Sequence, residues 1–138
     1  MSKPLFLTGA GIFLILGLTH ALLLLSDFRW PRALVPTDNR VRDAMRAAPL
    51  RLAPQTTIWR SWLGFNLSHS LGLVVFGLLL GGLAIGDFGA VAGNAFVRFT
   101  SVTVSALYTL LAVRFWFWAP ATAAAIGTAC FLASALGN

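Results

Sequence analysis

Residues 58–85 read IWRSWLGFNLSHSLGLVVFGLLLGGLAI, a run that contains one charged residue, Arg60. As an α-helix this run would extend about 42 Å at 1.5 Å per residue, more than the roughly 30 Å of a bilayer's hydrocarbon core. From Leu71 to Leu83 every residue is apolar or glycine. The run therefore predicts a transmembrane helix.

Three other stretches have the length and composition of membrane spans. Leu5 to Ser26 contains no charged residue. It is too long for the apolar core of a secretory signal peptide, and no small-x-small cleavage site precedes Asp27. Glycines and Asn94 predict a tight turn after the second span, and Pro120 marks the turn before the fourth. The predicted fold is an all-α four-transmembrane-helix bundle forming a single membrane domain over 1–138, with spans at about 5–26, 58–85, 95–118 and 121–136.

Composition places the chain in the membrane class. Of its 138 residues, 58% are hydrophobic and only 10% are charged, whereas soluble domains carry about 25% charged residues. Ten lysines and arginines and four aspartates, with no glutamate, give a formal net charge of +6. The single cysteine, Cys130, excludes an intramolecular disulfide and a cysteine-cluster metal site.

Residues 27–57 form the one substantial polar segment, and four prolines divide it into pieces too short for one continuous helix. After the second of these prolines, Thr37 or Asp38 is placed to cap a short helix. The apolar residues of this helix share one face and its arginines lie largely off that face, which predicts an amphipathic helix in the headgroup region. A simple topology signal would explain the same arginines. The predicted contacts with anionic lipid are Arg40, Arg42 and Arg46.

The distribution of basic residues predicts the orientation. Seven of the ten lie in or just beside the polar loop, and no nucleic-acid-binding module surrounds them. The expected partner is therefore a membrane surface and not a nucleic acid. Because cytoplasmic loops carry an excess of arginine and lysine, we expect a multi-pass protein of a bacterial inner membrane with the loop in the cytoplasm and both termini outside. Lys3 and Arg98 oppose this orientation.

Polar residues at membrane depth distinguish the second span. On an α-helix, which turns 100° per residue, four side chains fall within about 100° of one another: Trp62, Asn66, His69 and Ser70. They should face the bundle interior, because isolated asparagine and histidine side chains facing lipid would go unpaired. His20 in the first span lies at a comparable depth, and Asp27 follows on nearly the same face. The candidate ligand site or interhelical polar cluster is His20, Asp27, Trp62, Asn66, His69 and Ser70.

Small residues recur every four positions, a pattern that favours close helix contacts in membranes. The stripe of the fourth span is Ala121, Ala125, Ala129, Ala133 and Gly137, and that of the second span is Gly64, Ser68 and Gly72. The third span offers one slightly polar face with Ser101, Ser105, Tyr108 and Ala112. The spacing leaves open whether these contacts close one bundle or join subunits.

The second span also carries a resemblance. Its W-x-x-W-x-G-F-N-x-S-H run comprises Trp59, Trp62, Gly64, Phe65, Asn66, Ser68 and His69. The residues that accompany it are His20 in the preceding helix and Pro36, Asp38, Val41 and Met45 in the loop. Together they resemble a family of small, uncharacterised bacterial four-helix membrane proteins. The similarity covers most of the chain and implies a fold and a membrane location, but no activity.

The two histidines are the natural starting point for chemistry. Neutral imidazoles from two helices are the usual axial ligands of a b-type haem, which makes His20 and His69 candidates. A zinc site would need further ligands, of which only Asp27 is near enough, and a diiron site would need several acidic residues. Ser68 and Ser70 flank His69 but point to different faces. The sequence has no H-E-x-x-H motif, P-loop or dinucleotide fingerprint, so no catalytic residue is predicted.

The function that fits these observations is a small membrane protein without an enzymatic motif. It would be an accessory or structural subunit whose polar cluster bonds between helices, or which holds a lipid or a quinone in the bundle. The alternative is a haem-binding electron-transfer subunit that uses His20 and His69. The expected partners are membrane lipids, together with a homo-oligomer or a larger membrane complex.

Overall fold

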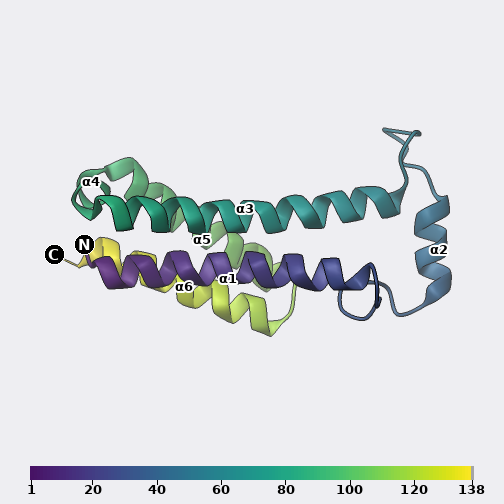
Figure 1. The fold of residues 1–138 in the computed structure, drawn as a ribbon, viewed down its shortest axis with the longest axis horizontal. Helices are drawn as coiled ribbons and strands as arrows, with labels where there is room; N and C mark the ends of the chain where they lie inside the picture. The colour runs from purple at the N-terminus through teal and green to yellow at the C-terminus, as the bar shows by residue number, and fades with distance from the viewer. Residues whose placement is uncertain (138) are drawn as a thin grey trace. The chain divides into compact units, whose positions relative to one another are not determined.

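The computed structural model describes residues 1–137, and this part of the chain is all-α. Its elements are α1 (Lys3–Asp27), α2 (Asn39–Ala47), α3 (Ile58–Gly86), α4 (Phe88–Gly93), α5 (Ala95–Phe115) and α6 (Trp118–Leu136) (Figure 1). The four long helices, α1, α3, α5 and α6, have 19 to 29 residues and are apolar enough to cross a membrane. The predicted four-helix membrane fold is thus confirmed, including the short helix in the polar loop.

The turn between the last two long helices lies earlier in the chain than the sequence predicted. α5 ends at Phe115 and α6 begins at Trp118, whereas the predicted spans ended at 118 and began at 121. Pro120 consequently lies inside the first turn of α6 and not in the connection. Proline is tolerated there because the first backbone N–H groups of a helix have no intrahelical acceptor.

The segment after α3 is a short helix where a tight turn was predicted. Asp87 caps α4, since its Oδ1 accepts a hydrogen bond from the backbone N–H of Ala90 at 3.0 Å. None of the described glycines has a positive φ, so the connection does not depend on the conformational freedom of glycine. The capping side chain of Asp87 favours a helix here. The glycines had wrongly indicated a tight turn.

The chain forms two compact units, which we call the terminal unit (Met1–Leu16 and Leu73–Asn138) and the loop unit (Gly17–Gly72). Helices α1 and α3 each contribute a segment to both. In the terminal unit, the hydroxyl of Ser134 donates to the carbonyl of Ser2 at 2.9 Å. That bond brings the beginning of α1 beside the end of α6.

An aromatic cluster forms the core of the terminal unit. Phe6 and Phe131 meet edge to face with ring centroids 5.1 Å apart, and Phe13 meets Phe76 in the same way at 5.4 Å. Phe6, Phe13 and Phe131 are buried. Edge-to-face ring pairs add about 0.5–1.5 kcal/mol beyond the burial of their surface.

Close approach in the terminal unit occurs at glycines outside the predicted stripes. A Cβ on Gly77 would lie 2.6 Å from the backbone nitrogen of Leu14, and one on Gly127 would lie 2.8 Å from the Phe13 ring. Of the predicted stripe residues, Ala125, Ala129, Ala133, Gly137, Gly64 and Ser68 are exposed in this chain. Within one chain, therefore, these stripes do not make the helix contacts. The polar face of α5 does point inward, with Ser101 and Ser105 buried.

In the loop unit, short-range hydrogen bonds fix the connection between α1 and α3. Asp38 is the cap of α2, because its Oδ1 accepts from the N–H of Arg40 at 2.8 Å. After α2, the N–H of Leu50 donates to the carbonyl of Thr56, and the N–H of Ile58 donates to that of Ala48. The chain thus returns to the start of α3 directly beside the end of α2.

Candidate functional site

The polar cluster of the loop unit is centred on a hydrogen bond between α1 and α3. Nε2 of His20 lies 3.1 Å from Oδ1 of Asn66, and both residues are buried, with exposed fractions of 9% and 6%. Helix α1 contributes His20 and helix α3 contributes Asn66. A bond of this kind satisfies two side chains that lipid could not.

The direction of this bond follows from the second contact of Asn66. Its Nδ2 donates to the carbonyl of Trp62 at 2.8 Å, which leaves Oδ1 as the acceptor facing His20. Nε2 of His20 must therefore carry the proton. Ser70 completes the chain of bonds, since its hydroxyl donates to the carbonyl of Asn66 at 3.0 Å. Both polar atoms of the Asn66 amide are used inside the protein.

His69 of α3 packs against His20 of α1. The two rings meet edge to face with centroids 5.3 Å apart, and Phe65 stacks on His69 with centroids 6.5 Å apart. The predicted approach of the two histidines is therefore present in the structure. Of the six predicted cluster residues, the loop unit brings five together: His20, Trp62, Asn66, His69 and Ser70.

This arrangement does not fit a b-type haem. A haem plane would have to enter between two imidazoles that are in contact, with one ring nitrogen from each side bound to the iron. Nε2 of His20, however, holds a proton that it donates to Asn66. Ligation through this atom would require breaking that bond and separating the two helices.

Asp27 is also buried, but its carboxylate bonds to the segment after α1 and not to the histidines. Its Oδ1 accepts from the N–H groups of Arg32 and Ala33, both at 2.9 Å, and its Oδ2 accepts from that of Leu34 at 2.6 Å. The carboxylate thereby organises the chain that leaves α1. It is not a third ligand beside the histidines, and residues 1–137 contain no group of three His, Cys, Asp or Glu side chains that could hold a metal ion.

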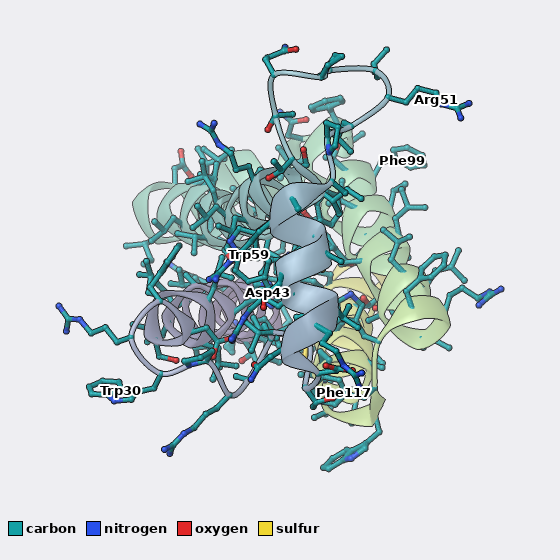
Figure 2. All side chains as sticks on the ribbon, turned by 90° about the vertical axis from the view of Figure 1, so that its right-hand side faces the viewer. Trp30, Asp43, Arg51, Trp59, Phe99 and Phe117 are labelled. Atoms are coloured by element: carbon teal, nitrogen blue, oxygen red, sulfur yellow. The ribbon has the colours of Figure 1, made fainter. Side chains whose placement is uncertain are left out.

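A second arrangement in the loop unit joins α2 to the start of α3. The guanidinium carbon of Arg46 lies 5.3 Å from the centre of the Trp59 ring. Trp59 in turn stacks on Trp62, with centroids 5.1 Å apart and an interplanar angle of 20°. Figure 2 shows Trp59 alongside α2, whereas Trp30 and Arg51 point away from the ribbon. We call Arg40, Arg42, Arg46, Trp59 and Trp62 the loop surface.

The stack in the loop surface was not foreseen. The sequence predicted a contact of Arg46 with anionic lipid, and Trp59 lies thirteen positions later in the chain. Nothing in the spacing indicates that the two would meet, because the approach depends on the route of the chain between Ala47 and Ile58.

The arginines of the loop surface are weakly engaged by the protein. Arg40 lies 3.6 Å from Asp38 and Arg46 lies 3.8 Å from Asp43, with arginine side chains 93% and 55% exposed. Exposed pairs of this length contribute little, about 0–1 kcal/mol. Arg42 is more enclosed, since its Nη2 donates to Asn39 and its Nε is shielded from solvent. Arg40 and Arg46 are therefore the arginines with the most donors facing outward.

Comparison of the chain with protein-family models, curated proteins and solved structures finds no match. The resemblance to small bacterial four-helix membrane proteins thus stays a hypothesis.

Proposed function

We propose that this chain is a non-enzymatic accessory protein of a bacterial inner membrane whose loop surface binds the headgroups of anionic phospholipids. The observation that carries the proposal is the stack of Arg46 on Trp59 and of Trp59 on Trp62. It holds a cationic helix against the end of an apolar span, which in the proposed topology would lie at the level of the lipid headgroups.

The chemistry of the loop surface suits a phosphate ligand. Guanidinium groups form strong, often bidentate hydrogen bonds with phosphate oxygens. Tryptophan at a membrane interface places an apolar ring beside acyl chains and a polar edge beside headgroups. Between Asp27 and Thr57 the chain carries six arginines and three aspartates, so the segment retains a positive excess that anionic lipid would neutralise.

The proposed orientation places the loop surface in the cytoplasm and both termini outside. It is supported by the positive excess of the loop, because basic residues in short loops mark the cytoplasmic side. The bond between Ser134 and Ser2 supports an even number of crossings, since it brings the two ends of the described chain together. The negative surface potential of a cytoplasmic leaflet would then attract α2.

The accessory role is supported by the use that the protein makes of its polar cluster. Asn66 bonds to His20 across two helices, and Ser70 bonds to the carbonyl of Asn66 within α3. Asp27 accepts from backbone N–H groups of the segment that follows α1. These residues account for their own burial without a substrate. A homo-oligomer or a larger membrane complex stays part of the proposal, and the exposed alanine stripe of α6 is the surface that it would use. A lipid or quinone inside the bundle also stays a prediction.

The test compares lipid retention by the full-length protein and by an R40Q/R42Q/R46Q variant. The purified proteins are titrated in mild detergent with phosphatidylglycerol and with phosphatidylcholine, and bound lipid is counted by native mass spectrometry at low and high salt. Each arginine near an anionic surface contributes about 1 kcal/mol, so the triple variant should bind phosphatidylglycerol about a hundredfold more weakly. Added salt should weaken the wild-type interaction, because exposed charges are screened.

Arg51 provides the matched control, since it is exposed in the same loop but points away from α2 (Figure 2). Arg51→Gln should retain phosphatidylglycerol nearly as the wild type does. Equal retention of the two lipids by the wild type, or binding that does not change with salt, would refute the proposal.

A further inference from the structure

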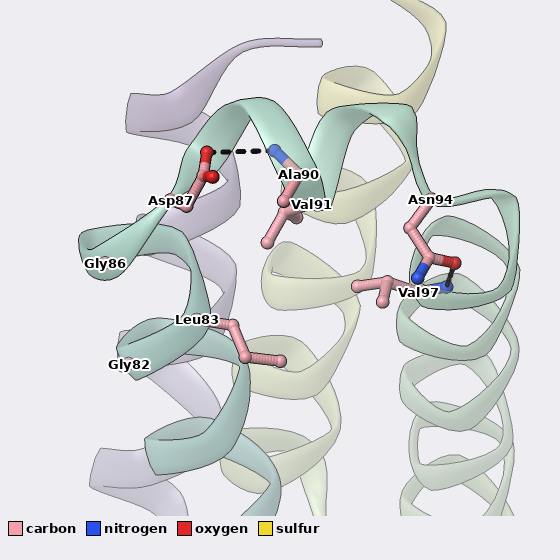
Figure 3. Close-up of a pocket in the computed structure, with 8 residues that line it drawn as sticks. All are labelled: Gly82, Leu83, Gly86, Asp87, Ala90, Val91, Asn94 and Val97. Atoms are coloured by element: carbon pink, nitrogen blue, oxygen red, sulfur yellow. Dashed lines mark hydrogen bonds between the residues drawn. The ribbon is translucent and has the colours of Figure 1, made fainter.

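The terminal unit contains a partly open hollow of about 450 Å³ between the end of α3, α4 and the start of α5. Its volume falls within the roughly 300–1,000 Å³ of ligand pockets. Figure 3 shows Leu83, Val91 and Val97 pointing into it from three different helices. The hollow thus offers an apolar surface that the core of the chain does not fill.

Two glycines keep the α3 side of this hollow open. Gly82 and Gly86 line it, and a Cβ built on either would meet nothing within 4 Å. The space in front of them is therefore empty of protein. This differs from Gly77, one helical turn and a half earlier, where the backbone of α1 fills the equivalent space.

Figure 3 shows the two polar side chains of the hollow on opposite sides of it, Asp87 beside the end of α3 and Asn94 beside the start of α5. Among the described residues, Asp87 is the only ionisable one that lines it. Oδ1 of Asp87 accepts from Ala90, and Oδ2 has no protein partner among the described residues. Oδ1 of Asn94 accepts hydrogen bonds from the N–H groups of Phe96 and Val97. Its Nδ2 thus stays available as a donor.

The order of these groups along the chain matches the layers of a membrane. Asp87 follows the last residue of α3, a span long enough to reach the interface, while Leu83 lies four residues deeper, about 6 Å along the helix. A ligand here would meet a negative charge at headgroup level and apolar side chains below it. Within residues 1–137, no basic residue lines the hollow to hold an anionic headgroup.

We infer that this hollow binds one molecule of a phospholipid with a primary ammonium headgroup, phosphatidylethanolamine. The ammonium donates to Oδ2 of Asp87, Nδ2 of Asn94 donates to a phosphate or ester oxygen, and an acyl chain packs on Leu83 and Val91. Charge complementarity decides the occupant, because the single carboxylate favours an ammonium and disfavours a lipid whose net charge is negative. The site is separate from the loop surface in residues and opposite to it in the charge that it selects.

The experiment fills the hollow without disturbing the fold. Full-length wild-type protein, Gly82→Leu and Gly64→Leu are purified in mild detergent, titrated with phosphatidylethanolamine and with phosphatidylglycerol, and examined by native mass spectrometry. Gly64 is the matched control, because it lies on the same helix, also has nothing within 4 Å of a built Cβ, and does not line the hollow. Gly82→Leu should lose the high-affinity phosphatidylethanolamine by at least about tenfold, whereas Gly64→Leu should keep it.

A second variant tests the charge. Asp87→Asn preserves the cap of α4, since asparagine and aspartate are comparable caps, but it removes the partner of the ammonium. Its preference for phosphatidylethanolamine over phosphatidylcholine should fall by about tenfold, as expected for a lost bond to a charged group. Thermal unfolding of each variant confirms that it is folded.

Three results would overturn the inference. The first is equal retention of phosphatidylethanolamine and phosphatidylglycerol by the R40Q/R42Q/R46Q variant, in which the loop surface no longer contributes. The second is unchanged retention in Gly82→Leu. The third is a wild-type dimer that Gly82→Leu converts to a monomer, which would assign the hollow to a second copy of the chain. Failure of the loop surface would instead appear as weak phosphatidylglycerol binding with normal phosphatidylethanolamine binding.

Discussion

Nε2 of His20 donates a hydrogen bond to Oδ1 of Asn66 at 3.1 Å, and this bond joins α1 to α3 within the loop unit. Because Asn66 also donates to the carbonyl of Trp62, its amide is oriented before it meets His20. Both side chains are buried, and the bond between them forms only when the two helices are aligned. It therefore selects one rotation and one depth for each helix in addition to stabilising the pair.

Removing either member of this pair should destabilise the protein. His20→Ala leaves Oδ1 of Asn66 without its donor, and Asn66→Ala leaves Nε2 of His20 without its acceptor. Each change should lower the free energy of unfolding by about 1–2 kcal/mol. The double variant should lose less than the sum of the two, with a coupling of about 0.6–1.7 kcal/mol. Unfolding by a denaturing detergent in mixed micelles measures all four proteins.

Ser68→Ala is the control for this cycle. Ser68 lies on the exposed face of the same helix and donates only to the carbonyl of Phe65, three residues back. Its loss should change the free energy of unfolding by less than about 0.5 kcal/mol. Strict additivity of the His20 and Asn66 variants would show that the bond contributes nothing of its own.

The second prediction concerns the carboxylate that organises the start of the loop. Asp27→Ala removes the acceptor of three backbone N–H groups, those of Arg32, Ala33 and Leu34. Since a hydrogen bond to a charged group contributes about 1.5–3 kcal/mol, this segment should open more often and trypsin should cut after Arg29 or Arg32 at least about tenfold faster. Limited proteolysis of the purified protein in detergent measures the rate.

Two substitutions separate the role of Asp27 from its charge. Asp27→Asn keeps one oxygen acceptor and should give an intermediate rate of cleavage. Asp43→Asn removes an exposed aspartate whose ion pair with Arg46 is 3.8 Å long, and it should leave the rate near that of the wild type. An Asp27→Ala protein as resistant as the wild type would show that the three hydrogen bonds do not hold this segment.

The cluster could be predicted from sequence because its members follow helical periodicity. His20 and His69 lie at comparable depths in apolar helices, and the polar face of α3 had to point away from lipid. The role of Asp27 could not be predicted in the same way. Its partners are backbone N–H groups of an irregular segment, whose direction depends on turns that hydrophobic periodicity does not describe.

Helix contacts were less predictable, for a physical reason. Alanine and glycine at four-residue spacing permit close approach but do not require it, so several stripes were equally suitable. In this chain the aromatic cluster around Phe13 and Phe131 decides which face of α6 turns inward. That face includes Gly127 and leaves Ala125 and Ala129 exposed. Likewise, the cap at Asp87 made a helix out of a segment rich in glycine.

Gly77 makes the close contact between α1 and α3 that the predicted stripes do not make. A Cβ on Gly77 would lie 2.6 Å from the backbone nitrogen of Leu14 and 2.7 Å from the carbonyl oxygen of Ala10. Backbone atoms cannot rotate away, so Gly77→Ala must push α1 and α3 apart within the terminal unit. The expected loss of unfolding free energy is about 1–3 kcal/mol, although alanine favours a helix over glycine by about 1 kcal/mol. Gly64→Ala, on the same helix with nothing within 4 Å of its Cβ, should be neutral or slightly stabilising. Thermal unfolding in the same detergent measures both, and equal stability of the two variants would mean that the contact at Gly77 is not part of the folded protein.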